Sequence, residues 1–206
     1  MTPEVAQYAR NVRRFYRKAR VAERRKGRMW YADAHRFCAI LAREKGLSID
    51  VTCGVLAALS PRVSWSENLR AALCLVKLDT LPAGTMVLPA NVAKALRILK
   101  GEAPLDVLRG EKVVAFYLCI RKPATSRAVC VDTHAIRAAI GDIEADEHKT
   151  SPYFRKARSR TVQDAYRRVA RQERMQPHRL QAVVWLVVKR LIEELPTEVQ
   201  TNLYVK

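Results

Sequence analysis

The sequence contains few cysteines, histidines and acidic residues, and each shortage excludes a class of protein. Its five cysteines form no CxxC pair, which argues against a zinc ribbon, a thioredoxin-type site and a cysteine-ligated cluster. Its four histidines form no HxH or HxxxH pair. We therefore expect no metal and no cofactor, and we interpret the cysteines as small buried side chains in a reducing compartment.

Long apolar runs are also missing. The longest apolar stretches, 51–59 and 182–188, are far shorter than the roughly 20 residues that a membrane span needs. The first fifteen residues (MTPEVAQYARNVRRF) lack the apolar stretch of a secretory signal. We expect a cytoplasmic protein with no membrane partner.

Basic residues outnumber acidic residues by 38 to 20, which gives a net charge of +18 and a pI near 10.2. Such a protein attracts polyanions, because each neutralised phosphate releases condensed counterions. A solvated helix face is the alternative, but such a face mixes both signs of charge. We predict a nucleic-acid partner. The basic residues form two clusters, Arg10, Arg13, Arg14, Arg17, Lys18, Arg20, Arg24, Arg25, Lys26 and Arg28, and then Lys149, Arg155, Lys156, Arg158, Arg160, Arg167, Arg168, Arg171 and Arg174.

Apolar residues recur at helical spacing along most of the chain, and no stretch alternates for long with a period of two. Thr2, Ser48 and Ser64 are expected N-caps, and Gly46 is an expected helix stop. The fold class is therefore all-α, with an irregular loop at 141–160. The predicted helices cover residues 3–16, 30–45, 48–59, 64–76, 90–99, 104–108, 113–120, 133–140, 161–174 and 177–194.

A chain of this length suits one domain, which we assign to residues 1–206. Residues 48–140 are predicted to form its core. The basic helices of 1–47 and the helices of 161–194 are predicted to form a second lobe. We expect a compact monomer.

One motif carries chemistry. A glycine turn, LRGEK at 108–112, is followed by VDTH at 131–134, whose aspartate lies twenty residues after the lysine. Gly110 lies between two predicted helices, where a turn requires a positive φ and exposed N–H groups can bind a phosphate oxygen. Arg109 and Lys112 flank Gly110 and add positive charge. An ordinary helix–helix turn is the alternative.

This order of helix, glycine turn, helix and VDTH segment resembles the helix-hairpin-helix DNA glycosylases, the HhH-GPD superfamily that includes endonuclease III. Residues 55–62 (VLAALSPR) are similar to the apolar helix and loop with which those enzymes enter the duplex, and the resemblance covers 48–140. The basic ends and the helix with Gln181 and Trp185 look more like those of small phage-encoded relatives. The resemblance implies a helical HhH-GPD-like fold and double-stranded DNA as the partner.

Asp132 matches the catalytic carboxylate of that family. Cleavage of an N-glycosidic bond builds positive charge on the deoxyribose, which a fixed anion stabilises, and the carboxylate can also orient or deprotonate the attacking water. The alternative role is an N-cap for the helix that follows. Both roles can coexist, because a helix N-terminus favours the ionised carboxylate.

The resemblance also bears on the nucleophile. Leu108 precedes Asp132 by 24 positions, as the matching leucine does in endonuclease III-like enzymes. This gapless match places Val114 at the family's Schiff-base lysine and Lys112 at its second hairpin glycine. Because valine cannot form an imine, the resemblance implies a monofunctional enzyme that uses water and leaves an abasic site. Lys112 is the alternative catalytic residue. The family's cluster-binding cysteines are absent, so no iron–sulfur cluster is expected.

Four further residues have two interpretations each. Arg62 matches the loop position that fills the gap left by a flipped base, and a surface phosphate contact is the alternative. Trp65 and Tyr117 are candidates for stacking on the flipped base, or they pack in the core. We interpret His134 as structural or as facing the DNA backbone, and a catalytic role is the alternative.

These observations predict a DNA glycosylase that excises a modified base in the cytoplasm of a prokaryotic or phage-infected cell. The modified base follows from the resemblance alone. Two rival functions stay open: a non-catalytic helix-hairpin-helix DNA-binding protein, and a related enzyme that acts on the substituent of a hypermodified base.

Overall fold

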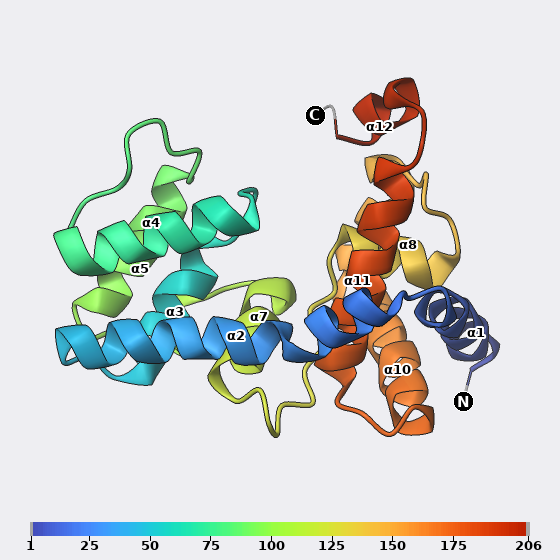
Figure 1. Ribbon diagram of the computed structural model, residues 1–206, viewed down its shortest axis with the longest axis horizontal. Helices are drawn as coiled ribbons and strands as arrows, with labels where there is room; N and C mark the ends of the chain where they lie inside the picture. The colour runs from blue at the N-terminus through green and yellow to red at the C-terminus, as the bar shows by residue number, and fades with distance from the viewer. Residues whose placement is uncertain (1, 205–206) are drawn as a thin grey trace. The chain divides into compact units, whose positions relative to one another are not determined.

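The computed structural model describes residues 2–204, and every regular element within them is a helix (Figure 1). The all-α prediction is confirmed. The elements are α1 (Pro3–Arg17), α2 (Val21–Lys45), α3 (Ile49–Leu59), α4 (Trp65–Leu78), α5 (Pro89–Leu99), α6 (Pro104–Val107), α7 (Glu111–Arg121), α8 (Thr133–Ile140), α9 (Glu147–Thr150), the 3-10 helix η1 (Ser151–Phe154), α10 (Lys156–Gln172), α11 (Pro177–Glu193) and α12 (Thr197–Tyr204).

The predicted helix ends are confirmed where a cap marks them. The side chains of Thr2, Ser48 and Ser64 each accept a hydrogen bond from the backbone N–H three residues later. Gly46 ends α2 with a φ of +63°. A cap satisfies a donor or acceptor that the helix itself cannot reach, so these boundaries are determined by the local sequence.

Three helical segments were not predicted. α2 begins at Val21 instead of near residue 30, although residues 21–29 are mostly polar. The segment 141–160 was predicted to be irregular, but it contains α9, η1 and the first residues of α10. Asp146 caps α9 by accepting a hydrogen bond from the Lys149 backbone N–H at 2.9 Å. α12 is the third such segment.

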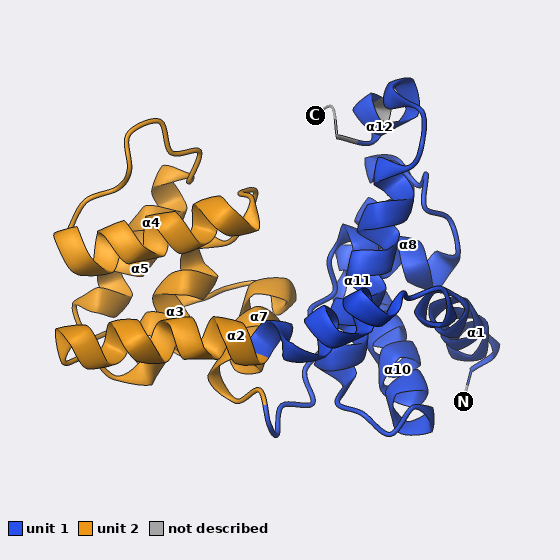
Figure 2. Ribbon diagram, viewed as in Figure 1, with its two compact units in different colours: residues 1–31, 124–206 blue, residues 32–123 orange. Residues whose placement is uncertain are grey.

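The helices form two compact units (Figure 2). Unit 1 comprises residues 1–31 and 124–206, and unit 2 comprises residues 32–123. The predicted division, with a core at 48–140, differs from this at both ends. α8 packs against α1, α10 and α11 in unit 1, because its buried alanines and Ile136 belong to the apolar core there. Most of α2, by contrast, belongs to unit 2.

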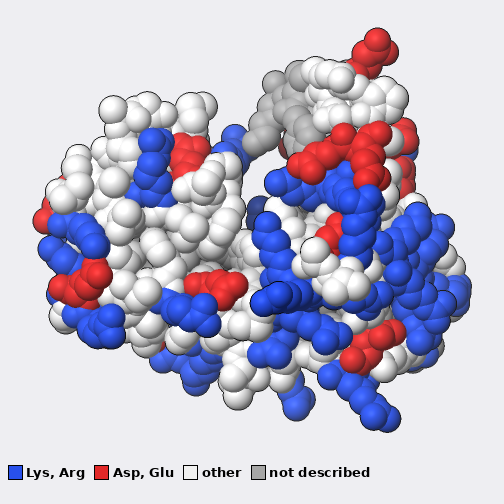
Figure 3. Space-filling model, viewed as in Figure 1, with Lys and Arg blue, Asp and Glu red and all other residues white. Residues whose placement is uncertain are grey.

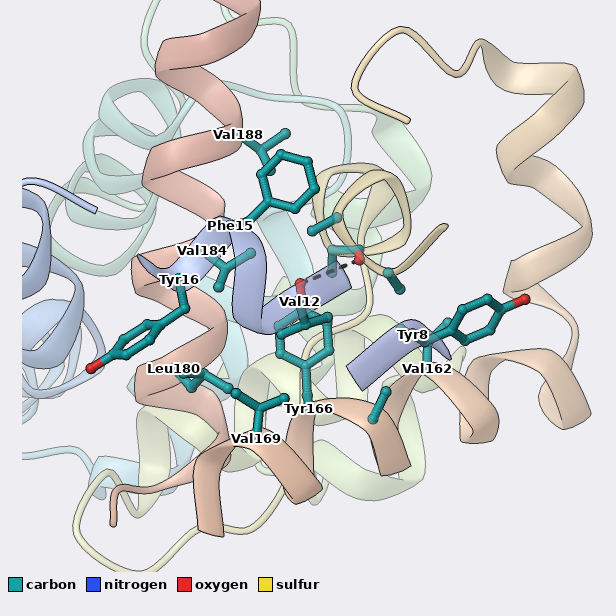
Figure 4. Packing of buried hydrophobic residues seen from close by; sticks show 14 of the residues in the cluster. Tyr8, Val12, Phe15, Tyr16, Val162, Tyr166, Val169, Leu180, Val184 and Val188 are labelled. Carbon is teal, nitrogen blue, oxygen red and sulfur yellow. Dashed lines mark hydrogen bonds between the residues drawn. The ribbon is translucent and has the colours of Figure 1, made fainter. Parts of the chain in front are cut away.

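The core of unit 1 is a cluster of buried apolar side chains from α1, α8, α10 and α11 (Figure 4). α1 contributes Tyr8, Val12, Phe15 and Tyr16, which recur at helical spacing on one face. Tyr166 of α10 is fully buried among them. The polar faces of the same helices carry the basic residues, so burial of the apolar stripe leaves the charges outside.

The centre of unit 2 is α3. Residues 52–59 of this helix are all buried, and α4, α5, α6 and α7 each pack against it. At its N-terminus Asp50 is paired with Arg121 of α7, whose Nη2 lies 2.7 Å from the Asp50 Oδ2. A helix that is apolar on most faces needs neighbours around it, and these four helices cover α3 together with α2, whose Cys38 carbonyl oxygen accepts a hydrogen bond from the Thr52 hydroxyl.

Gly27 lies very close to Val183 of α11 within unit 1. A Cβ at this position would lie 2.6 Å from the Cα, the backbone N and the Cγ2 of Val183. We expect Gly27→Ala to lower the free energy of unfolding by about 2 kcal/mol or more, because this overpacking outweighs the gain of about 1 kcal/mol in helix propensity. Urea unfolding measures the change. The exposed neighbour provides a control, since Lys26→Ala is expected to stay within about 0.5 kcal/mol of wild type. Equal stability of the two variants would contradict the close contact.

Candidate functional site

Asp132 lies at the point where an extended segment of unit 1 enters α8. Its backbone is extended, with φ −107° and ψ −179°, and its Oδ1 accepts a hydrogen bond from the Ala135 N–H at 2.7 Å. The side chain is half-buried. The predicted N-cap is therefore confirmed. This hydrogen bond fixes one carboxylate oxygen, and the helix N-terminus favours the negative charge.

Tyr166 supports the same turn from the core side. Its hydroxyl donates a hydrogen bond to the Ala135 carbonyl oxygen at 3.2 Å, which ties α10 to the first turn of α8 (Figure 4). Burial, and secondly the charge of Asp132, raise the pKa of the Tyr166 phenol well above its ordinary value. Tyr166 is thus a neutral hydrogen-bond donor that holds the peptide to which Asp132 is anchored.

His134 and Trp185 form a second polar and aromatic group at this end of α8. Their rings stack at a centroid distance of 5.4 Å and an interplanar angle of 20°. The Lys189 Nζ lies 5.6 Å from the Trp185 ring centroid and 3.6 Å from a Glu193 carboxylate oxygen. This stacking on Trp185 agrees with the interpretation of His134 as a structural residue.

The sequence did not single out Trp185 as part of this group. Trp185 lies one position away from the buried stripe of α11, which includes Val184 and Val188. It is half-buried although most residues around it are buried. An indole displaced from an apolar stripe is the signal that identifies such a residue, because it presents an aromatic edge or face outside the core.

The predicted hairpin of unit 2 joins α6 to α7. Gly110 is the N-cap of α7 with a φ of +85°, as predicted, and a Cβ at this position would meet no atom within 4 Å. Arg109 is exposed, and its Nη1 donates to the carbonyl oxygens of Leu105 and Leu108 at 3.2 and 3.1 Å. No side chain caps α7. The approach to this uncapped helix N-terminus is open, and its first turn carries the carboxylate of Glu111 as well as Lys112.

Lys112 and Val114 differ in exposure. Lys112 is exposed in the first turn of α7, whereas Val114 is half-buried in the same helix. Both belong to unit 2, and Asp132 belongs to unit 1.

Arg62 occupies the loop between α3 and α4 and is exposed. Its φ of +66° is uncommon for a residue with a Cβ and costs free energy. Trp65, the first residue of α4, is half-buried, and its ring meets the ring of Phe116 edge to face at 6.4 Å. Arg62 thus has the exposure that either of its predicted roles requires.

Tyr117 is only 3% exposed in the core of unit 2. Burial, followed by the charge of Asp50, raises the pKa of its phenol to about 12. A base needs an open ring face, so the burial of Tyr117 agrees with core packing, one of its two interpretations, and not with contact with a flipped base.

A family model matches residues 2–191, and its description is "Family of unknown function (DUF7178)". The chain belongs to DUF7178. No curated protein and no solved structure matches it. The family description states no activity, so the residues of this DUF7178 chain have to carry the functional argument.

The charge of the DUF7178 chain is concentrated in unit 1. Residues 1–31 and 124–206 hold 25 of the 38 basic and 12 of the 20 acidic residues. In Figure 3, Lys and Arg cover much of the visible surface of this unit. Some are paired, as Arg190 is with Glu23 at 2.7 Å and Arg13 with Glu173 at 3.3 Å. Many others are exposed, among them Arg10, Arg14, Arg17, Lys18, Arg25, Lys26, Arg28, Arg155, Lys156, Arg158, Arg160, Arg171 and Arg174.

The first turn of α10 contains basic residues and no acidic one. Arg155 is its N-cap, without a side-chain cap hydrogen bond, and Lys156 and Arg158 follow. Positive charge at a helix N-terminus is destabilising because it opposes the helix dipole. A bound polyanion would remove this repulsion.

Among the described residues, no group of three or more His, Cys, Asp or Glu side chains is placed to hold a metal ion. None of the helices between residues 2 and 204 has the length and apolar content required to cross a bilayer.

Proposed function

We propose that the protein is a monofunctional DNA glycosylase with a helix-hairpin-helix fold, which binds double-stranded DNA and hydrolyses the N-glycosidic bond of a modified base. The observation that carries the proposal is the half-buried, anchored carboxylate of Asp132 at the start of α8, in the unit that holds most of the basic residues. The resemblance of residues 108–134 to the HhH-GPD motif gives this carboxylate its reaction. We further propose that the protein acts as a cytoplasmic, DNA-associated monomer.

Asp132 has the chemistry for this reaction. When the base departs, the deoxyribose develops positive charge, and an anion held in a fixed position stabilises that charge more in the transition state than in the substrate. One oxygen is held by the Ala135 N–H. The other carboxylate oxygen would face the sugar and orient or deprotonate the water that attacks the anomeric carbon. The products are a free base and an abasic site.

DNA binding in this proposal uses three features. The exposed basic residues of α1, α2 and α10 attract the duplex, the N-terminus of α7 at Gly110 accepts a phosphate oxygen, and Arg62 fills the space of the extruded base. Arg109 and Lys112 add charge beside Gly110. The exposure of these groups supports the proposal.

The proposal is tested by incubating the full chain with duplex DNAs that carry different bases, including hypermodified phage DNA, and identifying any released base by mass spectrometry. Release of one base with an abasic site left behind is the expected result. Binding without release from any substrate would favour the non-catalytic DNA-binding protein. An altered base that stays on the strand would favour an enzyme that acts on the substituent.

Binding to unmodified duplex DNA is expected to weaken steeply as salt rises. Each phosphate contact contributes about −0.9 to the slope of log affinity against log salt, so five contacts give a slope of about −4.5. Fluorescence anisotropy between ~50 and ~200 mM salt measures this slope. A slope near zero would mean that the basic surface of unit 1 does not contact the DNA backbone.

A further inference from the structure

The turn between α10 and α11 forms a pocket of about 350 Å³ within unit 1. It is a shallow and open depression of the surface. Three of its residues are arginines, and none is acidic. The lining residues are Ala170, Arg171, Arg174, Met175, Gln176 and Arg179.

The three arginines have no carboxylate to balance them. Among the described residues, the side chains of Arg171, Arg174 and Arg179 have no hydrogen bond or ion pair. Glu173, the acid closest to them in sequence, is paired with Arg13. Some arginines elsewhere in unit 1 are paired, as Arg190 is with two glutamates. Unbalanced like charges around one pocket repel one another, and an anion removes that repulsion.

The position of Arg174 points to a role for its side chain. α10 ends in a Schellman motif, in which the Met175 N–H bonds to the Ala170 carbonyl oxygen at 3.0 Å and the Arg174 N–H bonds to the Arg171 carbonyl oxygen at 3.3 Å. The residue at the position of Arg174 has to be left-handed, and its φ is +51°. Glycine or asparagine adopts this conformation more easily, so an arginine here makes the turn less stable than either would. What the arginine adds at this position is its positive charge.

The start of α11 adds further positive potential. Its N-cap, Gln176, makes no side-chain hydrogen bond to the helix, because its Nε2 donates to the Ala124 carbonyl oxygen at 3.2 Å. Gln176 also lines the pocket, so the uncapped N-terminus of this 17-residue helix lies at the pocket's edge. The helix dipole places partial positive charge there.

We infer that Arg171, Arg174 and Arg179 form a phosphate-binding pocket that holds one backbone phosphate of the bound nucleic acid. Guanidinium groups bind phosphate through paired N–H donors, and three of them line this one open pocket. The pocket is larger than a phosphate group alone needs, and Ala170 and Met175 give it an apolar wall for the adjoining sugar. This inference rests on the proposed binding of DNA and specifies where the backbone is held.

The test compares two triple variants of the full chain with equal loss of charge. The pocket variant is Arg171→Gln, Arg174→Gln and Arg179→Gln, and glutamine keeps a Cβ at position 174. The control changes three exposed basic residues of unit 2, Arg43→Gln, Arg70→Gln and Lys100→Gln. Circular dichroism and thermal unfolding establish that both variants fold.

Anisotropy with a labelled duplex should give the pocket variant at least tenfold weaker binding and a salt slope less steep by one phosphate contact, about 0.9. The control should bind within about threefold of wild type. Equal losses in the two variants would overturn the pocket, because the effect would then follow net charge alone. An unchanged pocket variant would overturn it as well.

A second measurement separates this inference from the proposed function. Inorganic pyrophosphate is titrated into wild type and the pocket variant, and the rise in Tm is recorded. If wild type does not bind duplex DNA, the proposed function fails. A rise in wild type alone then supports a pocket for free phosphate groups, and no rise in either protein overturns the pocket.

Discussion

Replacing Asp132 by asparagine should lower the rate of base release by orders of magnitude and leave duplex binding unchanged or stronger. Asparagine has nearly the same shape but no negative charge. The carboxylate acts on a positive charge that exists only in the transition state, so its loss affects the chemical step and not the binding of uncharged sugar. Single-turnover release of the base, quantified by mass spectrometry, measures the rate, and anisotropy measures binding.

The same variant should fold normally. Its side-chain oxygen can still accept the hydrogen bond from the Ala135 N–H, which is 2.7 Å long in the wild-type structure. Asparagine is also a good N-cap, so at most about 1 kcal/mol of stability should be lost. A loss of activity in a folded protein can then be attributed to the charge.

Asp146 provides a matched control. It is also an N-cap aspartate of unit 1, and its Oδ1 accepts a hydrogen bond from the Lys149 N–H at 2.9 Å. Asp146→Asn makes the same chemical change at a cap that the proposal gives no catalytic role, and it should retain full activity. Full activity in Asp132→Asn would leave Asp132 as a helix cap only, and equal losses in both variants would attribute the effect to capping.

The features predicted correctly from the sequence are those determined by residues a few positions apart in the chain. An N-cap hydrogen bond joins residues only three positions apart, which is why α3 and α4 begin where Ser48 and Ser64 indicate. The positive φ of Gly110 and the capping role of Asp132 are local in the same sense. These signals were sufficient to place both parts of the motif at helix starts.

The features that the sequence did not reveal depend on contacts between distant residues. Residues 21–29 have no apolar periodicity, and the helix there is supported by contacts such as that of Gly27 with Val183. The burial of Tyr117 and the stacking of His134 on Trp185 likewise depend on which helices meet. A hydrophobic pattern identifies a buried face but does not identify its partner.

The distribution of charge also has a part that the sequence reveals and a part that depends on contacts between distant residues. The two basic clusters are visible in the sequence, but the ion pairs that neutralise some of their members are not. Arg13 and Glu173 are 160 positions apart and Arg190 and Glu23 are 167 positions apart. The sequence therefore does not distinguish the arginines of the α10–α11 pocket, which have no carboxylate partner, from those that do.

The second large effect concerns the step after base loss, where we expect no strand cleavage and no covalent adduct. A bifunctional glycosylase attacks the sugar with an amine and forms an imine, which borohydride reduces to a stable cross-link. Val114, which the resemblance to the helix-hairpin-helix glycosylases aligns with their Schiff-base lysine, has no amine and is half-buried in α7. Water is therefore the nucleophile in this proposal. DNA treated with the protein should stay intact until alkali or heat breaks the abasic site, as a denaturing gel would show.

Lys112 makes this expectation testable within the same chain. It is exposed two residues before Val114, and it is the amine in the hairpin that a different alignment would make catalytic. Borohydride should cross-link no protein to substrate DNA under conditions in which a bifunctional glycosylase, treated alongside, is trapped in full. An adduct that forms with wild type and disappears in Lys112→Ala would overturn the gapless match from Leu108 to Asp132 and make Lys112 the nucleophile. Breaks that appear only after alkali, with no adduct in either protein, would establish water as the attacking group.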